Sequence, residues 1–160
     1  MDNIYQECIE LLKQREVTLD DMAEIVMDIQ KQYIKDLTYD QVMTCLNSVL
    51  HKREVQYAIL TGISIDTSAE KGLVTSKNLQ KQLMTDGSLY GVDEVLAYGI
   101  CNLYGSIALT NFGYLDKVKP KIVEKLNTKA EGKCNVFLDD IVSAIIASTA
   151  SKLAHGASNQ

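Results

Sequence analysis

The sequence has few of the residues from which zinc sites and disulfide bonds are built. Histidine occurs only as His51 and His155, and neither lies near a pair of cysteines. The four cysteines are widely spaced and form no Cys-x-x-Cys motif, which argues against a structural zinc site. This spacing is typical of reduced thiols, so we expect a cytoplasmic protein without disulfide bonds.

Positive charge is also scarce. The 160 residues include 16 Lys and Arg against 21 Asp and Glu, a net charge of −5, and no basic stripe with interleaved aromatic residues. This balance argues against nucleic acid as a partner. The N-terminus lacks the basic and apolar regions of a signal peptide. The most membrane-like run, 92–109, contains Asp93, Glu94 and Asn102, so we interpret it as a buried helix.

Proline occurs once, at Pro120, and the sequence shows neither the alternation of β-strands nor an internal repeat. Apolar residues instead recur at helical spacing, and Thr18 and Thr38 are suited to cap the helices that follow them. We therefore predict an all-α fold, a single-domain multi-helix bundle with two long central apolar helices. These two helices are expected at about 91–109 and 136–155.

The chain divides by composition into a first part and a more apolar second part. We expect residues 1–51 to form an N-terminal helical extension packed on the bundle, and 52–155 to form the main helical domain. The polar tail, 156–160, is expected to be disordered.

Five carboxylates stand out because they interrupt or flank apolar runs, where an acid is costly unless it is paired or binds a cation. They occur in three short motifs and are Asp93, Glu94, Asp116, Asp139 and Asp140. Helical spacing places Asp93 at the head of a face with Ala97, Cys101 and Gly105, and Asp140 at the head of a similar small-residue face. If these two helices run in the same direction the acid pairs meet, and if they are antiparallel the pairs lie apart. The sequence leaves both arrangements open.

Carboxylate ligands without histidine favour Mg²⁺ or Mn²⁺ over zinc. A simpler interpretation is that the acids only interact with the positive ends of helix dipoles. The combination of the three motifs nevertheless favours a metal site.

The three motifs, in their order and spacing, resemble the phosphatidylglycerophosphatase A family, and most closely its soluble branch of low-temperature-requirement C proteins. The motifs are Gly91-Val92-Asp93-Glu94-Val95, Asn111-Phe112 with Asp116-Lys117-Val118-Lys119-Pro120, and Phe137-Leu138-Asp139-Asp140. The resemblance implies an all-helical fold and Mg²⁺-dependent hydrolysis of a phosphomonoester such as phosphatidylglycerophosphate. It also implies that the five acids are metal ligands, with Asp116, Asp139 and Asp140 as catalytic acids.

In such an enzyme Lys117, Lys119 and Asn111 are candidate phosphate-binding residues. The expected partner is a phosphorylated small molecule or a phospholipid headgroup, which is compatible with peripheral contact with a membrane. The expected cofactor is Mg²⁺ or Mn²⁺.

Two departures from the membrane-bound members of the family keep other hypotheses open. Gly113 stands where those enzymes have an arginine, and 60–68 retains little of their Gly/Ser/Pro-rich segment. One alternative is therefore a catalytically weakened, metal-binding regulatory or adaptor protein on the same fold. Another is a structural homo-oligomer whose acids are helix caps. Small-residue helix faces suit subunit packing, so we expect a homo-oligomer under each hypothesis.

Overall fold

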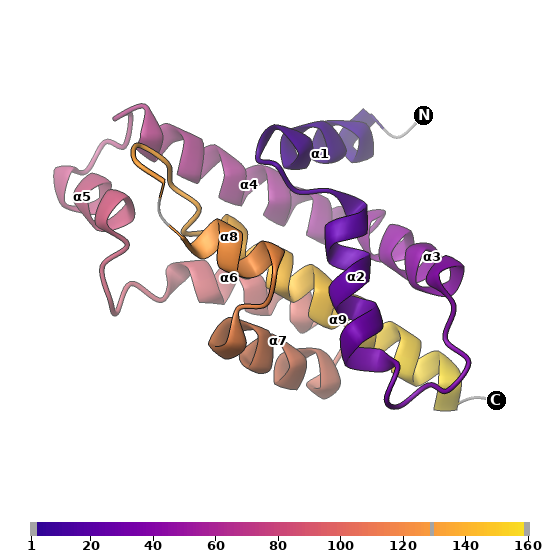
Figure 1. The fold of residues 1–160 in the computed structure, drawn as a ribbon. Helices are drawn as coiled ribbons and strands as arrows, with labels where there is room; N and C mark the ends of the chain where they lie inside the picture. The colour runs from indigo at the N-terminus through magenta and orange to yellow at the C-terminus, as the bar shows by residue number, and fades with distance from the viewer. Residues whose placement is uncertain (1–2, 129, 159–160) are drawn as a thin grey trace.

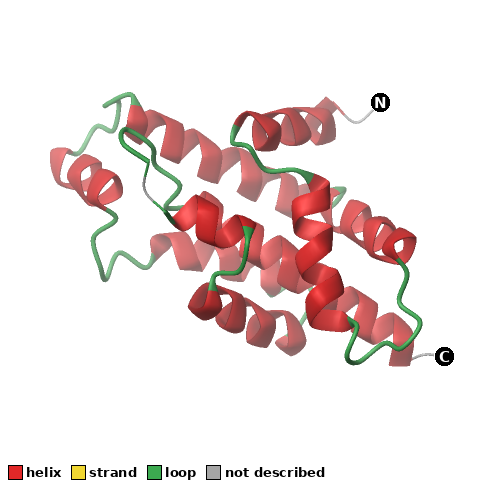
Figure 2. Cartoon of the chain, in the orientation of Figure 1, coloured by secondary structure: helices red, strands yellow, loops and turns green. Residues whose placement is uncertain are grey.

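The computed structural model describes residues 3–128 and 130–158, and every regular element in that part of the chain is a helix, as Figure 2 shows. The helices are α1 (Asn3–Gln14), α2 (Leu19–Gln30), α3 (Tyr39–Leu50), α4 (Arg53–Glu70), α5 (Lys77–Thr85), α6 (Val92–Cys101), α7 (Ser106–Val118), α8 (Ile122–Asn127) and α9 (Leu138–Ser158). The predicted all-α, single-domain bundle is confirmed.

The last helix, α9, is the centre of the bundle (Figure 1). It contacts α2, α3, α4, α6, α7 and α8, and every residue from Leu138 to Ser151 is buried. A helix that is apolar or small on all sides has no face suited to water, so it becomes the core. Six helices therefore pack directly on α9, and α1 and α5 pack on α4.

Two helix starts follow from local sequence. Thr18 and Thr38 each accept a hydrogen bond from the backbone of the third helical residue, and the side chains of Asp21 and Gln41 bond back to the capping residues. These capping boxes satisfy amide groups that the helix itself cannot. Both predicted caps are confirmed.

The helix expected over 91–109 is instead two helices. α6 ends at Cys101, and α7 begins at Ser106 and continues to Val118. Gly105 lies between them with φ at 92°, a conformation that glycine adopts without the steric cost of a Cβ. The break turns the chain, so the motif at 112–118 becomes part of a separate helix.

The first three helices pack on the rest of the bundle. α2 and α3 pack on α9, and α1 packs on α4. At the other end α9 runs through Ser158, so it includes the first three residues of the tail that was expected to be disordered. The last two residues, 159–160, lie outside the described residues. Over the described chain, no helix combines the length and the apolarity needed to cross a membrane.

Close packing of α4 on α9 depends on Gly62. A Cβ at this position would lie 2.2 Å from Cδ1 of Ile141 and 3.2 Å from Cβ of Phe137. We expect Gly62→Ala to lower the free energy of unfolding by about 1–2 kcal/mol, because overpacking outweighs the gain in helix propensity. Chemical denaturation measures the change.

Gly99 on α6 supplies the matched control for this substitution. Apart from its own neighbours in α6, no described atom lies within 4 Å of the position its Cβ would take. Gly99→Ala should therefore stabilise the protein by about 0.5–1 kcal/mol. Equal effects of the two substitutions would contradict the close approach of α4 and α9.

Candidate acidic site

The first turns of α6 and α9 bring two of the three acidic motifs together. Asp93 lies in the first turn of α6, and Asp139 and Asp140 lie in the first turn of α9. α6 packs on α9. Burial and the charge of Asp93 both raise the pKa of Asp139 and of Asp140, so the three carboxylates lie close together. The N-terminal ends of the two helices therefore meet, which is the arrangement that the sequence left undecided.

The last turn of α7 adds the third motif. Nζ of Lys119 lies 2.9 Å from Oδ1 of Asp116 and 3.7 Å from Oδ2 of Asp139. Lys119 caps the end of α7 in the left-handed conformation, so the chain leaves the direction of the helix three residues after Asp116. We call Asp93, Asp116, Asp139 and Asp140, with Lys119 among them, the acidic cluster.

Glu94 lies beside this cluster. It follows Asp93 in the first turn of α6 and is only partly buried. The pKa of the nearby Tyr98 hydroxyl is raised by burial first, and then by the charges of Glu94, Asp116 and Asp140. Glu94 thus lies at the edge of the acidic cluster and adds to its negative charge.

Asp139 and Asp140 are buried, the other members of the cluster are half-buried, and negative groups outnumber positive ones. Asp139 is 8% exposed and Asp140 is 4% exposed. Burial is the main cause that raises the pKa of Asp140, and the charges of Asp139, Asp93 and Asp116 raise that pKa further. Lys119 opposes the increase but is a single charge. A second cation would therefore be strongly attracted to this site.

The donor chemistry of the cluster fits a hard cation, because it offers only carboxylate oxygens. A cavity of 20 Å³ beside Asp86 and Asp139 has room for one water-sized particle. In residues 3–128 and 130–158, no three Asp, Glu, His or Cys side chains already form a ligand set for one metal ion. In this structure the ammonium group of Lys119 supplies the positive charge.

The three candidate phosphate-binding residues are dispersed. Lys119 belongs to the cluster, whereas Lys117 is exposed on the last turn of α7. Asn111 lies further back on α7 and lines a separate cavity of 530 Å³ with Gln30 of α2 and Ala154 of α9. Only Lys119 is therefore placed beside the acids.

Sequence reasoning missed one residue of this site. Asp86 caps the end of α5 in the left-handed conformation. Burial is the main cause that raises the pKa of Asp93 and of Asp139, and the charge of Asp86 raises both pKa values further. In the sequence, the dipeptide Asp86-Gly87 is typical only of a helix end. The charge that Asp86 adds to the site depends on where α5 packs, and the spacing of residues along the chain does not predict that position.

The crowding of acids predicts a pH dependence of stability. The pKa values of Asp93, Asp139 and Asp140 are raised in the folded protein, so the folded state binds protons more tightly than the unfolded chain. The contribution of these three groups to stability should be greatest below the ordinary aspartate pKa of about 4 and should fall as pH rises, by up to about 1.4 kcal/mol per pH unit for each group.

Asp140→Asn should reduce this slope, because it removes one of the titrating groups. The measurement is the free energy of unfolding in denaturant between about pH 5 and pH 8 without divalent ions. Asp40→Asn, in the first turn of α3, is the control and should keep the wild-type slope. Parallel curves for wild type and Asp140→Asn would show that the cluster is not crowded.

Comparison with known proteins places these features in a family. The uncharacterized protein YutG of Bacillus subtilis is 55% identical over 146 residues, which cover 91% of this chain and 87% of YutG. The low temperature requirement C protein of Listeria monocytogenes has a solved structure with a TM-score of 0.94 and 46% identity, covering 98% of each chain. A protein of unknown function from Bacillus stearothermophilus has a TM-score of 0.92 and 50% identity, covering 98% of this chain and 97% of its own.

The family model described as phosphatidylglycerophosphatase A matches residues 18–155, which include all three acidic motifs, the whole of α6 and α7, and α9 as far as His155. The resemblance found from the motifs is therefore confirmed, and the chain belongs to the phosphatidylglycerophosphatase A family.

Proposed function

We propose that this protein is a Mg²⁺- or Mn²⁺-dependent phosphatase that hydrolyses a phosphomonoester on a phospholipid headgroup, such as phosphatidylglycerophosphate. The observation that carries the proposal is the meeting of Asp93, Asp116, Asp139 and Asp140 at one end of the central helix, where Lys119 reaches Asp116 and Asp139. Membership of the family supports a phosphatase-like activity.

Each residue of the cluster has a chemical task in this proposal. Asp93, Asp139 and Asp140 hold the ion, which when bound polarises a phosphate and lowers the pKa of a water molecule. Asp116 is a ligand or the general base. Lys119, which already reaches Asp116 and Asp139, can donate a charge-assisted hydrogen bond to a phosphate oxygen at the same place.

Exposed apolar side chains next to the acids support a lipid rather than a small soluble substrate. On α6, Val92 and Val95 flank Asp93 and Glu94, and Val95 is 65% exposed. On α7, Val118 follows Asp116 and is also exposed. A substrate whose phosphate reaches the acids would place its hydrocarbon part near these side chains, where burial is favourable.

A second candidate function is a metal-binding regulatory protein with weakened catalysis. It is favoured by Gly113, which stands where the membrane-bound members have an arginine. Gly113 is exposed on α7, and apart from its own neighbours in that helix no described atom lies within 4 Å of the position its Cβ would take. A glycine has no side chain with which to make the bidentate phosphate contact that an arginine offers.

Substitution of the cluster separates these two functions. We expect Mg²⁺-dependent release of phosphate from phosphatidylglycerophosphate, and a loss of more than about 100-fold in Asp139→Asn and Asp140→Asn, since even residues behind metal ligands are worth about 10- to 100-fold. Asp40→Asn should retain full activity. No turnover by the wild type, or equal turnover by the cluster variants, would reject the phosphatase.

Metal binding can be measured without turnover. We expect Mn²⁺ to bind the wild type in an electron paramagnetic resonance titration, more tightly at pH 8 than at pH 6, because protons compete for the carboxylates. Asp140→Asn should bind Mn²⁺ more weakly at both pH values. Binding without phosphatase activity would favour the regulatory function, and absence of binding at both pH values would count against both functions.

A further inference from the structure

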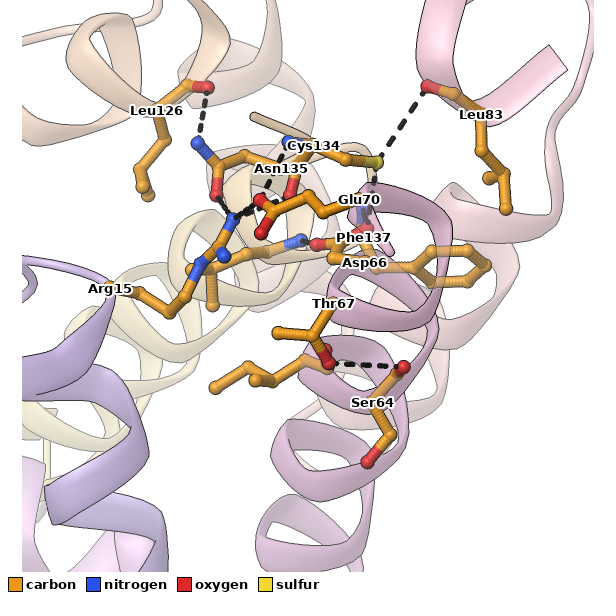
Figure 3. Close-up of polar contacts among 12 residues, drawn as sticks. Arg15, Ser64, Asp66, Thr67, Glu70, Leu83, Leu126, Cys134, Asn135 and Phe137 are labelled. Carbon is orange, nitrogen blue, oxygen red and sulfur yellow. Dashed lines mark hydrogen bonds and ion pairs between the residues drawn. The ribbon is translucent and has the colours of Figure 1, made fainter. Parts of the chain in front are cut away.

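The start of α9 is held by a side chain from another helix. Asp66 of α4 is fully buried, and its carboxylate accepts hydrogen bonds from the backbone N–H of Phe137, at 3.1 Å, and of Leu138, at 3.0 Å. The thiol of Cys134 donates to the same carboxylate at 3.5 Å. Figure 3 shows Asp66 directed at the segment that precedes α9.

This cap supplies hydrogen-bond acceptors that the sequence at the start of α9 lacks. The first amides of a helix have no partner within the helix, and the residue before it commonly supplies one through a short polar side chain. Here that residue is Phe137, whose side chain cannot accept a hydrogen bond. Because the helix start is buried, water cannot reach it easily, and Asp66 takes the place of the missing cap.

A second pair of residues holds the chain just before the cap. Nη2 of Arg15 lies 2.6 Å from Oε1 of Glu70, from the carbonyl oxygen of Cys134 and from Oδ1 of Asn135. Glu70, one turn after Asp66 on α4, also accepts a hydrogen bond from the N–H of Cys134 at 2.8 Å. The segment 134–138 is thus fixed at both ends by side chains of α4 and by Arg15 (Figure 3).

The fixed segment leads directly into the acidic cluster. Asp139 follows Leu138, so the position of its backbone and of Asp140 is set by the turn that Asp66 caps. Burial raises the pKa of Asp66 to about 7, against the effect of its N–H donors. Burying a carboxylate lowers stability more than a serine at position 137 would, although a serine could cap the helix as well. The use of Asp66 therefore points to a need to place Asp139 and Asp140 accurately.

We propose that Asp66, supported by Glu70 and Arg15, is the positioning residue of the acidic cluster and holds Asp139 and Asp140 where they can bind the cation. Asp66 itself touches neither the ion nor the phosphate. This inference rests on the proposed function of the cluster. It assigns a role to the buried face of α4, which lies outside the three acidic motifs.

The test is Asp66→Asn, which keeps the size of the side chain but leaves one acceptor oxygen for two N–H groups. We expect faster hydrogen exchange in peptides that span 134–141. Mn²⁺ binding should weaken and kcat should fall by about 10- to 100-fold, with little change in KM, as for other residues that orient metal ligands. Glu70→Gln, a milder change behind the same segment, should shift all three readouts in the same direction and serves if Asp66→Asn fails to fold.

Thr18→Ala is the matched control, because it removes the cap of α2 and leaves 134–140 unchanged. It should lower stability without altering exchange at 134–141, Mn²⁺ affinity or kcat. Unchanged exchange in Asp66→Asn would overturn the cap, and faster exchange with wild-type Mn²⁺ affinity and kcat would overturn the positioning role. If the wild type neither binds Mn²⁺ nor releases phosphate, the proposed function fails and the positioning role fails with it, while the exchange data still test the cap separately.

Discussion

The burial of α9 from Leu138 to Ser151 is the constraint on which the rest of the structure depends. A helix enclosed on all sides must satisfy its polar groups from within the protein, because water does not reach them. Its first turn has unpaired amides and two adjacent carboxylates, Asp139 and Asp140. Asp66 accepts the hydrogen bonds of the amides, and Asp93 and Lys119 approach the carboxylates.

The same constraint connects stability with function. Three helices deliver charged groups to the start of α9, and the sum of these charges is negative at a place with little solvent. Such a site is expensive in an isolated protein unless protons or a cation compensate it. The proposed binding of Mg²⁺ or Mn²⁺ gives these destabilising acids a function. Other helices of the chain begin without buried acids. Thr18 and Thr38 cap α2 and α3 with neutral hydroxyl groups.

Local sequence was sufficient for much of the fold and for the identity of the acids. The capping boxes at Thr18 and Thr38 and the apolar period of α9 depend only on neighbouring residues, so they could be predicted. The break at Gly105 was missed, because the apolar pattern of 92–109 continues across it. Asp66 was missed as well, although it lies three residues after Ile63 on the buried stripe of α4, where an acid is unexpected.

The sequence by itself determined which residues are acidic, which helices begin with them, and that small side chains follow Asp93 and Asp140. These properties are local, since they depend on residue type and helical spacing. Only the tertiary structure decided that α6 and α9 start at the same end, that Lys119 lies between Asp116 and Asp139, and that Asp66 caps α9. These contacts join residues far apart in the chain, and their geometry is set by how the helices pack around a buried centre.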